Sequence, residues 1–279
     1  MDQDTLRKVQ LSSVGIAKEI HRICKENDIQ YSITGGSVIG YHLYGGVIPW
    51  DDDVDIMMTR ENYEKFLSAS KTQLSPQYSL ENYENQKDKT VLFSKIVDKN
   101  TTVVEKKHDG QEIVGGVFAD ITVMDRVPQG AMRQKYFIFL SKVVQFCRDR
   151  NYERVKSCKS LIKNIGIFLI KPFSDSVYPF CKKQLTSVPA EKSAGYAEYL
   201  AGITKKYETD LFKQYSEISF EGAHLMIVSD YMQYLETRYG KRTFYKEQRD
   251  GDVPHHLIYA NCQMPFEEYL MKQRMDETK

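Results

Sequence analysis

The sequence predicts an α+β protein, with a core in which strands alternate with helices and a helical C-terminal extension. Strand-like and helical patterns alternate over the first 130 residues, and beyond Pro128 the strongest patterns are helical. A chain of 279 residues can form one large domain or a core with an appendage. We therefore expect a core over residues 1–130 and a mainly helical extension over 131–279 that completes the same site. The two parts should fold as one cooperative unit.

The first elements follow from apolar spacing and from the glycines. Apolar residues recur every three or four positions over residues 4–25, which predicts an amphipathic helix. The segment IQYSI at 29–33 reads as a short strand. Gly35 and Gly36 then predict a turn, and Ser37 is placed to cap a helix that runs through SVIGYHLY.

The later elements follow from the same two periodicities. Strand-like patterns occur at 54–58, 91–97 and 117–123, and a helical pattern occurs at 60–69. In the second half the clearest helices are QKYFIFLSKVVQFC and SLIKNIGIFLI, and a further helix ends at Tyr239 and Gly240.

The composition is that of an ordinary soluble globular protein. With 41% apolar residues, 28% charged residues and a net charge of +1, nothing points to nucleic acid as a partner. The five cysteines form an odd set without a C-x-x-C pair, which argues against a disulfide framework and a structural zinc site. No signal peptide and no apolar run near the ~20 residues of a membrane span occur. We therefore expect a cytoplasmic protein.

Four carboxylates, Asp51, Asp52, Asp53 and Asp55, directly follow Trp50, the only tryptophan. On a strand, residues two apart project to the same face, so Asp53 and Asp55 would point one way while their apolar neighbours point into the core. Two such carboxylates can converge on one ion, and their oxygen atoms suit Mg²⁺, which keeps room for water and phosphate. Without a cation, the like charges raise each other's pKa. The pattern therefore indicates a metal site for Mg²⁺, with Mn²⁺ as the alternative ion.

Two other interpretations of the acidic segment are available. A run of charges is most often a solvated turn. An EF-hand calcium loop also begins with three alternating acids, here Asp51, Asp53 and Asp55. The EF-hand fails because Ile56 stands where its glycine belongs, and Asn62 where its bidentate glutamate belongs.

The glycine turn adds a second half to the site. Gly35 and Gly36, followed by the Ser37 hydroxyl and a helix, allow backbone N–H groups to approach a phosphate closely, where the helix N-terminus favours negative charge. A Gly-Gly-Ser turn followed by Asp-x-Asp on a strand is the layout of the nucleotidyltransferase fold, a small mixed sheet flanked by helices. The combination is much more specific than either motif alone.

The chain resembles the LicD family, with the related fukutin and fukutin-related proteins, within the nucleotidyltransferase-fold superfamily. The resemblance begins at HRICKENDIQYSITGGSVIGYHLYGGVIPWDDDVDI and continues through FSKIVDKNTTV and GGVFADITVMDRVP. It resumes in FEGAHLMIVSDYMQYLETRYG and VPHH, and it is looser from about 130 to 205. The most specific element is I-P-W-D-D-D-V-D-I.

The resemblance implies a metal-dependent transferase. Such proteins move a phosphorylated alcohol, most familiarly phosphocholine from CDP-choline, to a hydroxyl of a surface or lipid-linked glycan. Magnesium-assisted transfer would then use Asp53, Asp55 and Asp120 to hold one or two ions, and the turn of Gly35 and Gly36 with Ser37 to grip the CDP-linked donor. CMP would be the leaving group.

Asp120 and Lys95 are the remaining predicted site residues. In GVFADITV, alternation sends Val117, Ala119 and Ile121 to one face and the single aspartate to the other. A charge on an otherwise apolar strand is costly without a partner, although an edge strand facing water would also tolerate it. Besides binding metal, Asp120 could orient or deprotonate the acceptor hydroxyl. By the same resemblance, Lys95 falls where a cation could neutralise donor phosphate.

The sequence departs from the family pattern at two places. Leu43 stands where such proteins commonly carry an arginine, and DITVMD replaces D-I-F-P-L-D. These changes concern the identity of the donor more than the chemistry.

Several other residues could support the site or serve only the fold. Asp51 and Asp52 would orient metal ligands or pair with basic groups. Trp50 could stack on a base or serve as a packing anchor. His255 and His256 are adjacent and therefore project differently, which makes substrate contact or plain surface a better interpretation than a metal pair.

Two other classes of protein could carry the same motifs. A nucleotidyltransferase that moves the nucleotide itself onto a small molecule or protein would use the same turn and the same aspartates. A non-catalytic binding protein could have kept the fold, which Leu43 and the altered strand after Asp120 make conceivable.

The segment 132–172 is strongly basic. It contains ten Lys or Arg residues against two acids, for a net charge of +8, while the rest of the chain carries −7. Apolar and aromatic residues interleave with these charges at helical spacing. The segment could therefore be an amphipathic helix with its apolar face on the core and its basic face in solvent. The alternative is that its basic face contacts anionic lipid, which would hold a cytoplasmic enzyme at the inner face of the membrane.

Overall fold

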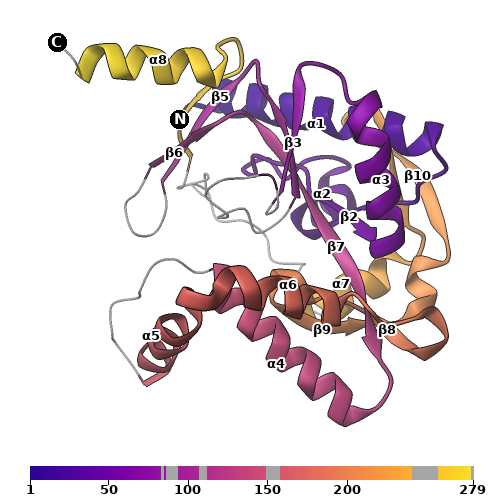
Figure 1. Ribbon diagram of the computed structural model, residues 1–279. Coiled ribbons are helices and arrows are strands. Elements are labelled where there is room, and N and C mark those ends of the chain that lie inside the picture. Colours follow the sequence, from indigo (N-terminus) through magenta and orange to yellow (C-terminus); the bar gives the residue numbers. More distant parts are fainter. Residues whose placement is uncertain (83–84, 86–93, 107–111, 149–157, 241–256, 278–279) are drawn as a thin grey trace.

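The computed structural model describes residues 1–82, 85, 94–106, 112–148, 158–240 and 257–277 (Figure 1). Its central feature is a mixed sheet. Five strands lie in the order β1-β2-β7-β4-β3, and β8 and β9 extend the sheet from β7. The strands are β1 (Ser32–Ile33), β2 (Ile56–Thr59), β3 (Tyr78–Glu81), β4 (Ser94–Asp98), β7 (Phe118–Pro128), β8 (Ser193–Glu198) and β9 (Ile203–Tyr207). The mixed sheet with its flanking helices confirms the predicted α+β class.

The long strand β7 organises the sheet. Its first half pairs in parallel with β2, with Ile56 opposite Ile121, and antiparallel with β4, with Lys95 opposite Asp120. Its second half pairs antiparallel with β8, with Asp125 opposite Ala197. One strand therefore joins the predicted core to the later part of the chain.

Helix α1 (Gln3–Glu26) begins where the Asp2 side chain accepts a 2.7 Å hydrogen bond from the Thr5 amide. Its buried stripe includes Ile16, Ile20 and Ile23, and it packs against β7, β11 (Ala223–Val228) and α3 (Arg60–Gln73). This confirms the predicted amphipathic helix. The stripe also buries polar side chains, which the apolar spacing did not predict.

Two further helices flank the motif strands. Helix α2 (Gly35–Tyr44) follows β1, and α3 (Arg60–Gln73) follows β2. Helix α2 starts two residues earlier than predicted, with Thr34 as its N-cap, because Gly35 adopts φ +59° and turns the chain directly into the helix. Gly45, at φ +70°, ends the helix.

The second half contains the expected helices and also strands. Figure 1 shows α4 (Ala131–Arg148), α5 (Cys158–Ile170) and α6 (Ser174–Leu185) grouped beyond the far end of β7. Helix α7 (Tyr231–Tyr239) ends at Gly240, as predicted. The added strands are β8, β9, the hairpin β10 (Tyr215–Phe220) and β11 (Ala223–Val228), and β12 (Leu257–Asn261), which pairs with β5 (Thr102–Lys106) beside β6 (Glu112–Gly115). Helix α8 (Phe266–Glu277) follows.

The hydrophobic core crosses the expected boundary at residue 130. The main cluster includes Ile20, Ile56 and Ile121 together with Leu225 and Tyr234 from the second half. A second cluster lies between α4, α6 and β8. The division at residue 130 and the single cooperative unit stay predictions that an unfolding measurement can address. Within the described ranges, no helix combines the length and apolarity needed to cross a bilayer.

Candidate active site

The aspartate loop is fixed by buried polar side chains of α1. Gln10 Nε2 donates hydrogen bonds to the carbonyl oxygens of Ile48 and Asp51, at 3.2 and 2.8 Å. Ser13 Oγ accepts a 2.8 Å hydrogen bond from the amide of Val54. Gln10 and Ser13 are only 3% and 0% exposed, so their hydrogen bonds fix the backbone of the loop from its buried side. A glutamine and a serine within an apolar stripe are the signals that could have revealed this role.

Strand β2 starts two residues later than predicted, so Asp53 and Asp55 lie in the extended loop that leads into it. Here the Asp55 backbone bonds to residues far back in the chain. The Asp55 amide donates 2.8 Å to Ser37 Oγ, and the Asp55 carbonyl accepts 2.9 Å from the Thr34 amide. The buried Ser37 hydroxyl therefore holds the aspartate loop against α2, instead of capping that helix as the sequence suggested.

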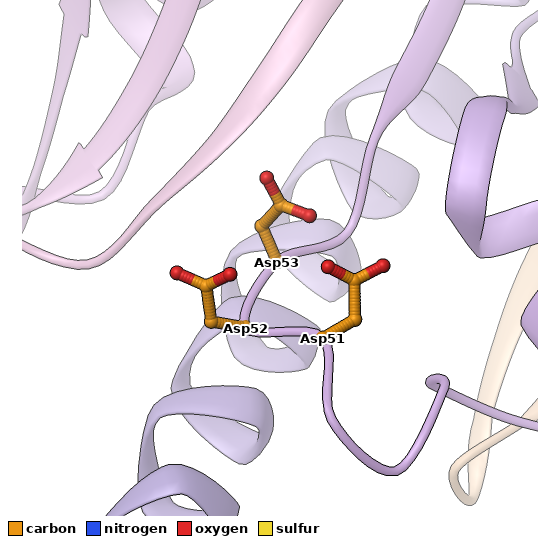
Figure 2. Close-up of side chains that lie close together, drawn as sticks. All are labelled: Asp51, Asp52 and Asp53. Atoms are coloured by element: carbon orange, nitrogen blue, oxygen red, sulfur yellow. The ribbon is translucent and has the colours of Figure 1, made fainter. Parts of the chain in front are cut away.

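Three neighbouring carboxylates are gathered at this loop. Asp51, Asp52 and Asp53 each offer an oxygen atom, and these atoms lie within 4.8 Å of one another. In Figure 2 the three side chains leave one short stretch of the loop, and their carboxylate groups project to the same side of it. Among the described residues this is the one group of three acidic, histidine or cysteine side chains at such a spacing. It differs from the predicted set of Asp53, Asp55 and Asp120.

Asp55 and Asp120 come together through the sheet register. Ile56 pairs with Ile121 between the parallel strands β2 and β7, so the two aspartates occupy equivalent positions one residue earlier. Adjacent strands lie ~4.8 Å apart, and both isoleucines are fully buried, so the aspartates share the opposite face. The predicted alternation around Asp120 is therefore present, with Ala119 and Ile121 both at 0% exposure.

Lys95 borders Asp120 on its other side. The two residues are opposite each other in the β4–β7 pairing, and Lys95 Nζ lies 3.4 Å from Asp120 Oδ1. The same Nζ is 3.3 Å from the centre of the Phe118 ring. Asp120 Oδ1 is buried, and the ion-pair distance to Lys95 does not have hydrogen-bond geometry, so this oxygen accepts no hydrogen bond from the described residues. Lys95 is thus placed at the edge of the acidic group.

The acidic group is electrostatically strained in the absence of a cation. Burial, followed by the charges of Asp55, Asp51, Asp52 and Asp120, raises the pKa of Asp53 well above its usual range. Burial and the charge of Asp120 raise the pKa of Asp55 to about 8. Burial also raises the pKa of Asp120, although Lys95 opposes the shift. A bound cation would favour the ionised forms of these groups.

The glycine turn lies directly against these carboxylates. A Cβ added to Gly35 would lie 2.9 Å from Asp55 Oδ2, and one added to Gly36 would lie 2.7 Å from Asp51 Oδ2. Both distances are too short for a side-chain carbon, so an added Cβ would displace the carboxylate ends of Asp55 and Asp51, and glycine at both positions lets the N-terminus of α2 approach them this closely. The phosphate-binding and acidic halves of the predicted site are therefore brought together.

The second half supplies groups that the sequence did not identify. The Tyr234 hydroxyl, from α7, accepts a 2.9 Å hydrogen bond from the Gly35 amide and pairs with Thr34 Oγ1 at 2.6 Å. One turn later, Arg238 forms an ion pair with the buried Glu198 of β8. The positive charge of Arg238 also acts on Asp55, where it opposes the rise in pKa that burial and Asp120 cause. Arg238 was missed because one charged residue near a helix end has no distinguishing spacing.

The residues present fit a hard divalent cation. All candidate ligands are carboxylates, the donor type that Mg²⁺ and Mn²⁺ prefer. Among the described residues, Lys95 pairs with Asp120 and the charge of Arg238 acts on Asp55. The buried Asp120 oxygen without a hydrogen bond is a further group that a cation would satisfy. Which of the five aspartates coordinate an ion stays a prediction.

The other predicted residues have simpler surroundings. Trp50 makes an edge-on contact with Tyr44, with ring centres 5.7 Å apart, which agrees with a packing anchor. Leu43 is 38% exposed on α2. Asp125, the last residue of DITVMD, is fully buried, and both its oxygens accept hydrogen bonds from Arg60 at 2.8 and 2.9 Å. His255 and His256 lie outside the described residues.

Comparison with known proteins bears on the family. The family model for the LicD/FKTN/FKRP nucleotidyltransferase domain matches residues 28–147, which span the glycine turn, the aspartate loop, Lys95 and Asp120. Residues 28–147 thus match a LicD-type nucleotidyltransferase domain, the family that the motifs resemble. The resemblance seen in the motifs, the fold class and the expectation of a LicD-type transferase are therefore confirmed.

Individual relatives support the same assignment. This chain is 26% identical over 275 residues to the lipopolysaccharide cholinephosphotransferase LicD of Haemophilus influenzae, an alignment that covers 93% of this chain and 99% of that protein. Shorter matches include an uncharacterised protein of Rickettsia prowazekii, 25% identical over 122 residues, covering 44% of this chain and 42% of that protein. Another is an uncharacterised protein of Rickettsia typhi, 32% identical over 86 residues, covering 31% of this chain and 26% of that protein.

Proposed function

We propose that this protein transfers a phosphorylated alcohol, with phosphocholine as the first candidate, from a CDP-linked donor to a hydroxyl group of a surface or lipid-linked glycan. The observation that carries the proposal is the direct packing of the Gly35–Gly36 turn on the aspartate loop. That arrangement offers a phosphate-binding helix N-terminus and a cation site within one small region. Full-length similarity to a lipopolysaccharide cholinephosphotransferase supports the choice of donor and acceptor class.

The chain's own residues divide the work of the reaction. Asp53 and Asp55, with Asp120, are the expected ligands for Mg²⁺ or Mn²⁺, and Asp51 and Asp52 orient them. A bound cation would neutralise the charge of the donor diphosphate. The N-terminus of α2 would favour the negative charge of the donor phosphates through the helix dipole, while its Gly35 amide is held by the Tyr234 hydroxyl. Ser37 acts indirectly, because its hydroxyl fixes the Asp55 backbone.

The transfer step is an in-line displacement at phosphorus. The acceptor oxygen forms a bond to the phosphorus that carries the alcohol, and the bond from that phosphorus to the CMP oxygen breaks, so CMP leaves with the electron pair. Asp120 is the candidate base for the acceptor proton, because its buried oxygen is free of hydrogen bonds within the described structure. Lys95, which pairs with Asp120, and Arg238, whose charge acts on Asp55, would neutralise charge that develops on the leaving phosphate.

A second reaction is compatible with the same residues. In a nucleotidyltransferase, the acceptor would attack the phosphorus that carries the cytidine. CMP would then be attached to the acceptor, and the phosphorylated alcohol would leave. The similarity to a cholinephosphotransferase over 93% of the chain favours phospho-alcohol transfer.

A donor labelled at two positions separates the two reactions. We expect that CDP-choline labelled in choline transfers its label to a glycan acceptor, while CDP-choline labelled in cytidine releases labelled CMP. Transfer of the cytidine label to any acceptor would favour nucleotidyl transfer instead. If neither label moves, CDP-ribitol, CDP-glycerol and other CDP-linked donors should be screened for metal-dependent CMP release. A protein that releases CMP from none of them, and binds no Mg²⁺, would be a non-catalytic member of the fold.

A further inference from the structure

A large group of apolar side chains is exposed on the helices beyond the far end of β7. Elsewhere in the described chain, exposed large apolar residues are scattered, but α4, α5, α6 and the turn between the last two carry ten of them. They are Met132, Tyr136, Phe139, Leu161, Ile162, Ile165, Phe168, Leu169, Phe173 and Phe180. Such concentrations on a soluble protein mark interaction surfaces.

Helix α5 shows why these side chains are not part of the core. One narrow edge of the helix packs on α4, where Gly166 lets the Phe146 ring approach to 3.0 Å of its Cβ position and Ile167 is fully buried. The other face carries Ile165, Phe168 and Leu169, which are 50%, 68% and 61% exposed. Three neighbouring positions this apolar and this exposed would be costly in water.

Helix α4 interleaves apolar and basic residues on its exposed face. Met132, Tyr136 and Phe139 alternate with Arg133, Lys135 and Lys142, and all six side chains are exposed. The segment 132–172 carries a net charge of +8. Apolar side chains surrounded by basic ones are the composition of a surface that enters the headgroup region of an anionic bilayer.

We propose that α4 and α5 form a membrane-docking surface for anionic phospholipid, with the apolar side chains inserted among the acyl chains and the basic side chains on the headgroups. A second copy of the chain is a poorer occupant, because it would bring two segments of +8 charge against each other. An anionic lipid surface offers both the apolar phase and the opposite charge. Lipid binding of this kind does not depend on the proposed reaction, so the two can fail separately.

Vesicle flotation tests the surface. The full chain is mixed with vesicles of phosphatidylcholine alone or with added phosphatidylglycerol, at low and high salt. We expect co-flotation with the anionic vesicles and its loss at high salt, because the Debye length falls from ~10 Å at 0.1 M to ~3 Å at 1 M. The Phe168→Gln/Leu169→Gln variant should bind anionic vesicles at least roughly tenfold more weakly.

Matched controls distinguish this surface from general stickiness. Met271→Gln/Met275→Gln removes two side chains on α8, each 63% exposed, and should float like the wild type. Arg133→Gln/Lys135→Gln/Lys142→Gln should lose binding, whereas Lys8→Gln/Lys65→Gln/Lys71→Gln, with the same change of charge on α1 and α3, should retain it. Asp53→Asn should also float normally, which keeps this test independent of catalysis.

The proposal is overturned by any of three results. The first is that equal amounts of protein float with neutral and anionic vesicles. The second is that the Phe168→Gln/Leu169→Gln variant floats like the wild type. The third is that the test variants and their controls lose vesicle binding to the same extent. Analytical ultracentrifugation of the same proteins measures their oligomeric state and so tests whether this surface joins two copies of the chain. If the wild type is a dimer that this variant converts to monomer while flotation is unaffected, the surface joins two copies of the chain instead.

Discussion

At the scale of single residues, Asp55 links the site to folding stability. Its pKa is raised from 3.8 in a model peptide to about 8, first by burial and then by Asp120 and Asp51. Between about pH 4 and pH 8 the folded protein therefore binds this proton more tightly than the unfolded chain, so metal-free stability falls as the pH rises through that window.

Asp55→Asn removes this pH dependence. We expect the variant to melt above the wild type at pH 8 in EDTA, with the gap closing toward pH 4, because the neutral amide avoids the buried charge. Thermal unfolding at several pH values measures the effect. Each ~1 kcal/mol of unfolding free energy shifts the melting temperature by about 2–4 °C for a chain of this size class. A gap in melting temperature that does not change with pH would show that Asp55 is not strained in the folded protein.

Asp125 has a different role at the same scale. It is fully buried, and both its oxygen atoms accept hydrogen bonds from Arg60 instead of joining the acidic group. Asp125→Asn should destabilise the protein by about 3–5 kcal/mol, because the buried arginine loses its partner charge. Denaturant titration measures this loss, and turnover per folded molecule should be unchanged. A fall in turnover without loss of stability would place Asp125 in the site.

At the scale of elements, the approach of α2 to the aspartate loop is the feature most open to test. Gly36 has no unusual φ, so Gly36→Ala changes little except the 2.7 Å contact that its Cβ would make with Asp51 Oδ2. We expect Mg²⁺ affinity and donor affinity to fall together, since one methyl group displaces both halves of the site. Calorimetric titration measures both. Gly115→Ala on β6, where a Cβ meets nothing within 4 Å, is the matched control and should bind normally.

At the scale of the whole molecule, the pair of Arg238 and Glu198 connects the second half to the site. Arg238→Gln leaves Glu198 buried at 1% exposure without its cation, which should cost about 3–5 kcal/mol. The Arg238→Gln/Glu198→Gln variant should recover much of that stability. Donor KM should stay raised roughly tenfold or more in both variants, because the positive charge that acts on Asp55 is absent from each.

The comparison of stability with KM separates two roles for Arg238. If donor KM returns to the wild-type value when stability is restored in the double variant, Arg238 is only a structural partner of Glu198. Glu198→Gln alone is the necessary reference, because it keeps the guanidinium whose charge acts on Asp55.

Most of the first half could be predicted from the sequence because its signals are local. Helix α1, the glycine turn and the alternation around Asp120 each depend on residues close in the chain. The bounds of β2 were less predictable, since they depend on a hydrogen bond from the Asp55 amide to Ser37, 18 positions earlier.

The contribution of the second half could not be predicted in the same way. Arg238 and Glu198 are 40 residues apart, and each alone resembles a surface charge. Strands β8 and β12 are defined by partners far away in the chain, β7 for β8 and β5 for β12. The exposure of Phe168 and Leu169 likewise depends on which edge of α5 packs on α4, which spacing alone does not reveal.

The most direct test of the central claim is CMP release from CDP-choline as a function of Mg²⁺ concentration, in wild type and Asp53→Asn. The account predicts a rate that rises to saturation with Mg²⁺ in the wild type and disappears in EDTA. Asp53→Asn should remain folded and release CMP only at background rate at every Mg²⁺ concentration. CMP release at an undiminished rate in EDTA, or by Asp53→Asn, would contradict it.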